Sequence, residues 1–180
     1  RKCHGFEWME QNEDYHEWLH DHSPTHGIDD WFGGGVRNND WTVHPWHLDE
    51  SLHQTNWTVE RSLRFMARRD PSRPFFLSLG FIAAHPPFQP PAFYFERYLR
   101  TGVPDPWIGD WAIPPVAGED DREDYPSAHR IALPDEAMRS MRAAFYGLIN
   151  RVDDQLRRLI NPVKGLRHRR DTIIILTSDH

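Results

Sequence analysis

The side chains best suited to chemistry follow two short apolar runs of this sequence. Residues 74–81 lead to His85, and residues 172–177 lead almost directly to Asp179 and His180. Both runs have the length and the β-branched or aromatic content of buried strands. Because ligands collect beyond the carboxyl ends of parallel strands, the three side chains are expected at one edge of a sheet.

Asp179 and His180 are candidate metal ligands. Where a strand gives way to a loop, two adjacent side chains can turn toward the same ion. A carboxylate oxygen beside an imidazole nitrogen is compatible with Ca, Mg, Mn or Zn. The alternative is that Asp179 caps a following helix beside an exposed His180, and spacing alone leaves both interpretations open.

His85 is a candidate catalytic residue. Two small residues precede it, and Pro86 and Pro87 follow it, so the local backbone is restricted. An imidazole presented in this way can donate to an anionic oxygen or protonate a leaving group. The alternative is a turn histidine that bonds only to backbone.

The pattern of elements predicts an α/β fold. Helices are expected over residues 13–20, 58–69 and 92–100, and a longer one from Pro134 to residue 160, closed by Asn161-Pro162. Helix, turn and buried strand follow one another twice, which favours a mostly parallel central sheet flanked by helices and joined by long ordered loops.

Composition restricts the classes of protein. A net charge of −6 over 180 residues gives no basic surface for nucleic acid. The one cysteine, Cys3, cannot form an internal disulfide, and no apolar stretch approaches the ~20 residues of a membrane span. Two long loops remain, the Trp-rich residues 31–57 and the Pro-rich residues 101–134, and they are expected to select a ligand.

Three blocks of the sequence together resemble the sulfatase family of the alkaline phosphatase superfamily. Residues 73–81 with the following His85-Pro86-Pro87-Phe88 resemble that family's mid-domain signature. Residues 145–155 are similar to its long helix, and residues 172–180 to its strand that leads to the metal site. The blocks occur in the family's order and cover residues 57–180.

The resemblance implies a hydrolase of sulfate monoesters, either small-molecule or carbohydrate esters. Residues 1–180 would be the central part of one catalytic domain, an internal fragment without the nucleophile region and the C-terminal part. Asp179 and His180 would be ligands of a divalent cation, usually Ca in this family. His180 stands where many members have Asn, which leaves Mn or Zn open. His85 would contact the sulfate group and assist the leaving oxygen.

Two departures from the family pattern bear on activity. The family's nucleophile is a formylglycine made from a Cys/Ser-x-Pro-x-Arg motif, which this sequence lacks, and Cys3 has none of the required neighbours. The fragment alone is therefore expected to be inactive, with the nucleophile upstream. Ile82 and Ala84 stand where members often carry His and Pro, which affects the expected sulfate contacts.

Two other functions remain open. One is a phosphodiester or phosphonate monoester hydrolase of the same superfamily. The other is a non-catalytic carbohydrate-binding module that uses the two long loops. Periplasmic or secreted localisation follows only by analogy with the family, and the substrate and oligomeric state are open.

Overall fold

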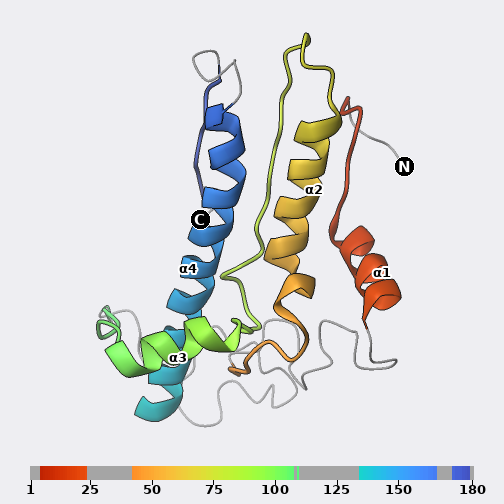
Figure 1. Cartoon of the computed structure of the whole chain (residues 1–180). Coiled ribbons are helices and arrows are strands. Elements are labelled where there is room, and N and C mark those ends of the chain that lie inside the picture. Colours follow the sequence, from red (N-terminus) through yellow and green to blue (C-terminus); the bar gives the residue numbers. More distant parts are fainter. Residues whose placement is uncertain (1–4, 24–41, 108, 110–133, 166–171, 179–180) are drawn as a thin grey trace.

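The computed structural model describes residues 5–23, 42–107, 109, 134–165 and 172–178, with side chains up to residue 161 in the last helix. Within these residues, the elements are four α-helices and a short 3-10 helix: α1 Asn12–His22, η2 Glu50–Leu52, α2 Gln54–Arg68, α3 Ala92–Thr101 and α4 Asp135–Gly165. The long helices α2 and α4 run side by side in the same direction, and α3 crosses the first half of α4 (Figure 1).

The helix predictions are confirmed, with changes at some ends. Helix α1 extends the predicted range by one or two residues at each end, and the Asp14 carboxylate accepts the Gln11 N–H at 2.7 Å. Helix α2 begins four residues before the predicted Thr58, because the His53 side chain accepts a backbone N–H and caps the helix there. The predicted end of α4 at Asn161-Pro162 is wrong. The helix continues to Gly165, since a proline in a last turn removes one N–H without ending the helix.

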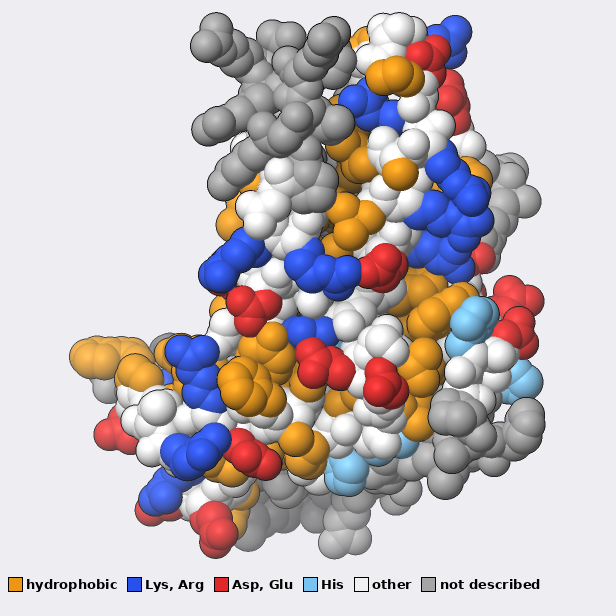
Figure 2. Space-filling model, in the orientation of Figure 1, with side chains coloured by type: hydrophobic (Ala, Val, Ile, Leu, Met, Phe, Trp, Pro, Cys, Tyr) orange, Lys and Arg blue, Asp and Glu red, His pale blue; other side chains and the backbone are white. Residues whose placement is uncertain are grey.

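Hydrophobic side chains reach the surface between charged ones on the face shown in Figure 2. Buried aromatic and aliphatic side chains form two clusters. The first joins α1 to the start of α2 and contains Tyr15, Leu19, Leu52 and Trp57. The second joins α4 to the segment before α3 and contains Phe88, Ala144 and Leu148. Helices α3 and α4 approach closely at Gly147, where a Cβ would lie 3.3 Å from the backbone of Tyr94.

The predicted sheet is not observed in the described part of the chain. Residues 74–81 and 172–177 are extended, but neither pairs as a strand, and the one bridge found there is the isolated parallel pair Val43 and Phe88. Phe76 is 75% exposed, Ile173 87% and Leu176 83%, whereas Phe75, Leu77 and Leu79 are half-buried. A strand is stabilised by a ladder to its neighbours, and the described residues supply no such neighbour to either segment. The sheet therefore stays a prediction.

The direction of the two segments can nevertheless be followed in Figure 1. Each leaves the same end of the long helix that precedes it, α2 or α4, and runs back along that helix. The two segments consequently run in the same direction. Among the described helices, none combines the length and the apolar character that a membrane crossing requires.

Candidate functional site

His85 lies in a tight turn within residues 82–91, which we call the His85 loop. Its backbone N–H donates to the Ile82 carbonyl at 2.7 Å, and its side chain is exposed. The ring Nδ1 lies 2.6 Å from the Pro86 carbonyl oxygen. Because a carbonyl can only accept, Nδ1 carries a proton and Nε2 is the ring nitrogen available to a ligand. The ring thus makes the backbone bond of a turn histidine and also leaves one nitrogen accessible, so the catalytic role stays a prediction.

The segment before η2 forms backbone hydrogen bonds with residues 88 and 90 of the His85 loop. The His44 N–H donates to the Phe88 carbonyl at 3.2 Å, and the Trp46 N–H donates to the Pro90 carbonyl at 2.9 Å. These bonds extend the parallel bridge of Val43 and Phe88. Residues 43–46 of the Trp-rich segment are therefore attached to the loop that carries the candidate catalytic histidine.

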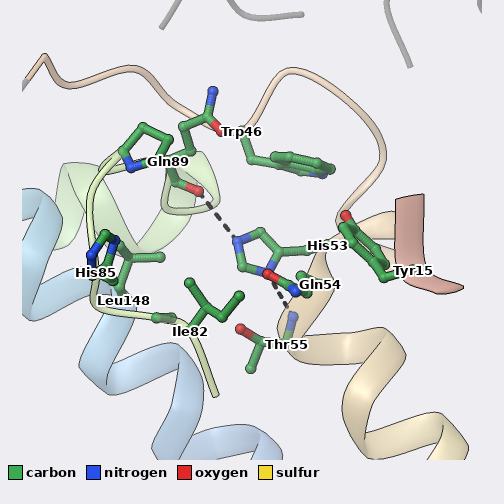
Figure 3. Close-up of a pocket in the computed structure, with 11 residues that line it drawn as sticks. Tyr15, Trp46, His53, Gln54, Thr55, Ile82, His85, Gln89 and Leu148 are labelled. Carbon is green, nitrogen blue, oxygen red and sulfur yellow. Dashed lines mark hydrogen bonds between the residues drawn. The ribbon is translucent and has the colours of Figure 1, made fainter. Parts of the chain in front are cut away.

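His53 attaches the start of α2 to the same loop. Its Nδ1 accepts the Thr55 N–H at 3.2 Å, so the proton of the neutral ring is on Nε2, which lies 3.3 Å from the Gln89 carbonyl oxygen. Both bonds are drawn in Figure 3. Burial, and next the positive charge of Arg151, lower the pKa of His53 from 6.5 to about 4. The ring is accordingly neutral at neutral pH.

A small cavity of about 30 Å³ separates His53 from the His85 turn. His85 and Leu148 lie on one side of it, and Tyr15 and Trp46 on the other (Figure 3). The Gln89 side chain, which also lines it, is 3% exposed, and both of its amide atoms lack a hydrogen-bond partner. A cavity of this size holds one or two water molecules and no substrate. The cavity is therefore part of the packing between His53 and the His85 loop and is not a substrate site.

A much larger hollow of about 2000 Å³ shares Ile82, Ala83 and His85 of the His85 loop with the small cavity. The apolar face of α4 lines it, together with residues 71–86 and 172–178. His85 and Ser178 are both in its wall, so the two segments predicted as strands contribute their ends to one hollow. Asp179 and His180 lie outside the described residues. Within the described residues, no three potential metal ligands come together.

A buried arginine network joins the helices behind the loop. Arg151 on α4 is 5% exposed; its guanidinium lies 2.5 Å from a Glu50 carboxylate oxygen and also donates to Asn56 and to the Tyr94 hydroxyl. The Tyr94 hydroxyl donates to Asp154 at 2.9 Å, and burial is the main cause of its raised pKa.

Sequence reasoning did not identify Arg151 or His53. A signal for Arg151 was present, because it follows Leu148 by three residues and precedes Gln155 by four on the buried side of α4. His53 had no such signal, since its role depends on contacts with a loop far along the chain. The neighbouring carboxylates of Asp153 and Asp154 both lie near the Arg157 guanidinium, at 3.6 and 3.9 Å, and Asp154 also accepts the hydrogen bond from Tyr94. The acidic residues 119–124 lie outside the described part.

Comparison with models of protein families identifies the family of this chain. The profile of the family described as Sulfatase matches residues 2–180. The chain belongs to the sulfatase family. An arylsulfatase of Clostridium perfringens is 36% identical to this sulfatase chain over 172 residues, which are 96% of the chain and 35% of the relative.

Two further relatives show the breadth of the family. A multifunctional protein of the alkaline phosphatase superfamily from Trinickia caryophylli is 30% identical and covers 77% of the chain, and the iduronate 2-sulfatase of Mus musculus is 28% identical and covers 68%. The chain spans only about a quarter to a third of the length of these relatives. The family is α/β, which agrees with the predicted class, although the described residues show its helices alone.

Proposed function

We propose that the protein to which this chain belongs hydrolyses sulfate monoesters. The observation that carries the proposal is the match of residues 2–180 to the sulfatase family, with arylsulfatase similarity along 96% of the chain. The exposed ring of His85 at the edge of the large hollow supports it. Small-molecule and carbohydrate sulfate esters are both candidate substrates, selected by residues 31–57 and 101–134. The first of these segments was expected to be a loop throughout, but its residues 50–52 and 54–57 lie in η2 and α2.

In the whole domain, residues 74–81 and 172–177 would be strands of a mostly parallel central sheet flanked by helices. Their common direction and their exposed apolar side chains support this assignment. Both would then end at the edge where His85 and Ser178 line the hollow. Residues 1–180 would form the central part of this one catalytic domain.

His85 would donate from Nε2. In the imidazolium form, Nδ1–H stays bonded to the Pro86 carbonyl, and Nε2–H points to a sulfuryl oxygen or to the leaving oxygen. As the bond between sulfur and the leaving oxygen breaks and the sulfuryl group passes to the nucleophile, transfer of that proton gives a neutral alcohol and a neutral histidine. The fixed Nδ1 bond orients the ring for this step.

Asp179 and His180 would hold a divalent cation. They directly follow residues that line the hollow, and a carboxylate with an imidazole is a donor set that divalent cations accept. Calcium is proposed first, with Mn or Zn as alternatives because of His180. When bound, the cation supplies positive charge that neutralises sulfuryl oxygens.

The nucleophile would come from another part of the whole protein. The sequence contains no Cys/Ser-x-Pro-x-Arg motif, so the formylglycine expected of the family cannot form within these residues. The 180-residue chain on its own is therefore proposed to be inactive.

The test compares the full-length protein with the 180-residue chain on 4-nitrophenyl sulfate, on a bis-aryl phosphate and on an aryl phosphonate monoester. Sulfate release by the full-length protein alone is expected. Preference for the phosphorus esters would favour the related superfamily activity, which the multifunctional relative brings into consideration. Turnover by the 180-residue chain would overturn the proposal on the nucleophile.

A carbohydrate-binding module is the candidate outside the enzymes. Polysaccharide binding by the full-length protein, unaffected by chelation and without ester hydrolysis, would support that function. Loss of cation binding in an Asp179→Asn variant, measured by calorimetry, is expected for the proposed metal site and would count against the module.

A further inference from the structure

The His85 loop depends on donors from outside itself. It contains Pro86, Pro87, Pro90 and Pro91, which have no N–H, so its carbonyl groups must find donors on other segments. Three consecutive carbonyls do so: those of Phe88 and Pro90 accept from the backbone of residues 44 and 46, and that of Gln89 accepts from the His53 side chain. Successive carbonyls of an extended chain point to opposite sides. The Gln89 bond therefore fixes the loop from the side that the backbone bonds leave open.

We infer that His53 is a positioning residue for His85. The inference rests on the proposed sulfatase function. The bond from His53 Nε2 to the Gln89 carbonyl holds the loop so that the His85 ring keeps its place in the wall of the hollow. His53 does not contact the substrate in this arrangement, because it lines the small cavity and not the hollow, whereas His85 lines both.

The imidazole ring suits this place because it has two nitrogens with different roles. Nδ1 accepts the Thr55 N–H and caps α2, while Nε2 donates to the loop. The Trp46 ring packs edge-on against the His53 ring, with the two ring centroids 5.2 Å apart. This contact and the two hydrogen bonds together fix the orientation of the His53 ring. Since His53 is 6% exposed, water does not readily replace either bond.

Two substitutions at His53 separate the role of Nδ1 in capping α2 from the role of Nε2 in binding the Gln89 carbonyl. The amide of His53→Asn places an oxygen near the Nδ1 position, so it keeps the cap and loses the bond to Gln89. The amide of His53→Gln places its nitrogen near the Nε2 position, so it keeps the bond to Gln89 and loses the cap. Each variant is thus the matched control of the other.

In the full-length protein, His53→Asn is expected to lower kcat for 4-nitrophenyl sulfate about tenfold or more with a small change in KM. It should also lower Tm by about 2–4 °C, because the buried Gln89 carbonyl loses its donor. His53→Gln is expected to keep kcat within about twofold and to lower Tm by about 2 °C. In a His85→Gln background, His53→Asn should have little further effect on kcat, because a positioning residue acts only through the residue that it positions.

Three results would each overturn the inference. The first is an unchanged kcat for His53→Asn, and the second is a loss of kcat in both variants in proportion to their loss of stability. The third is an effect of His53→Asn on kcat that is just as large in the His85→Gln background. Crystal structures of the two variants give a readout without activity: the His85 loop should shift in His53→Asn and not in His53→Gln. A wild-type protein that hydrolyses no sulfate ester would refute the proposed function instead, and the shift of the loop would still decide whether His53 positions His85.

Discussion

Arg151 of α4 and Glu50 of η2 form an ion pair in which nitrogen and oxygen are 2.5 Å apart. The same guanidinium donates to Asn56 of α2 and to Tyr94 of α3. One side chain thus joins four elements of the chain. Arginine suits this position because its planar group offers several donors in fixed directions.

Replacing Arg151 by Met is expected to destabilise the protein by about 2 kcal/mol. The substitution leaves the buried Asn56 and Tyr94 side chains without a donor, which is the costly part. The Glu50 carboxylate is about half exposed, so water can partly replace its lost partner. Urea unfolding of the full-length protein measures the difference in the free energy of unfolding.

Arg157→Met on the same helix is the control, since its ion pairs are exposed and its loss should cost under about 0.5 kcal/mol. Equal effects of the two substitutions would contradict the assigned role.

Stability is expected to fall as the pH falls from about 6.5 to 4, and His53 is the cause. Its pKa is lowered from 6.5 to about 4 in the folded protein, so between these values the unfolded chain binds a proton that the folded one does not. The contribution is present above pH 6.5 and is lost toward pH 4, with a full size of about 3 kcal/mol.

Unfolding midpoints measured at several pH values between 7 and 4 test this expectation. His53→Gln cannot titrate there and should show a weaker dependence on pH in that interval. Identical pH profiles of the variant and the wild type would rule out His53 as the source.

The helices could be predicted from the sequence because their signals are local. The proline and the acidic residues at 134–136 start α4, and the prolines before Ala92 precede α3. The start of α2 was misplaced because its cap is His53, a residue type that is uncommon at that position. Local patterns also placed residues 74–81 and 172–177 as extended, but a sheet requires neighbours that no local pattern supplies.

The candidate site could be predicted only in part. The sequence singled out His85 from its prolines and from family resemblance, and the structure places it in the wall of the hollow with Ser178. The residues that support His85 could not be found in this way. His53, Trp46 and Arg151 act through contacts between distant segments, and such contacts leave no regular spacing in a sequence.

The apolar wall of the hollow predicts different behaviour of the isolated chain and of the full-length protein. Phe76, Ile175 and Leu176 are at least 75% exposed, so the 180-residue chain should bind a hydrophobic dye and self-associate. If the full-length protein covers these residues in a sheet, its dye binding should be much lower. Dye fluorescence and sedimentation measure both properties.

The control for this comparison lies on α3. Ile175→Ser in the isolated chain should reduce dye binding, whereas Phe93→Ser should change it little, because Phe93 is exposed outside the hollow. An equal response to the two substitutions would indicate general surface binding and would contradict a role for the hollow.

The two roles proposed for His85 predict different leaving-group dependence. If Nε2–H protonates the leaving oxygen, His85→Gln should lower kcat by about 10²- to 10⁴-fold for an alkyl sulfate and by much less for 4-nitrophenyl sulfate, whose leaving oxygen needs little protonation. If Nε2–H only binds a sulfuryl oxygen, the loss should be similar for both esters. Steady-state kinetics of the full-length protein with the two substrates measure this ratio.

His44→Gln is the control, since His44 contributes its backbone N–H to the loop and a substitution preserves that bond. A kcat for His85→Gln equal to that of the wild type on both esters would exclude both roles.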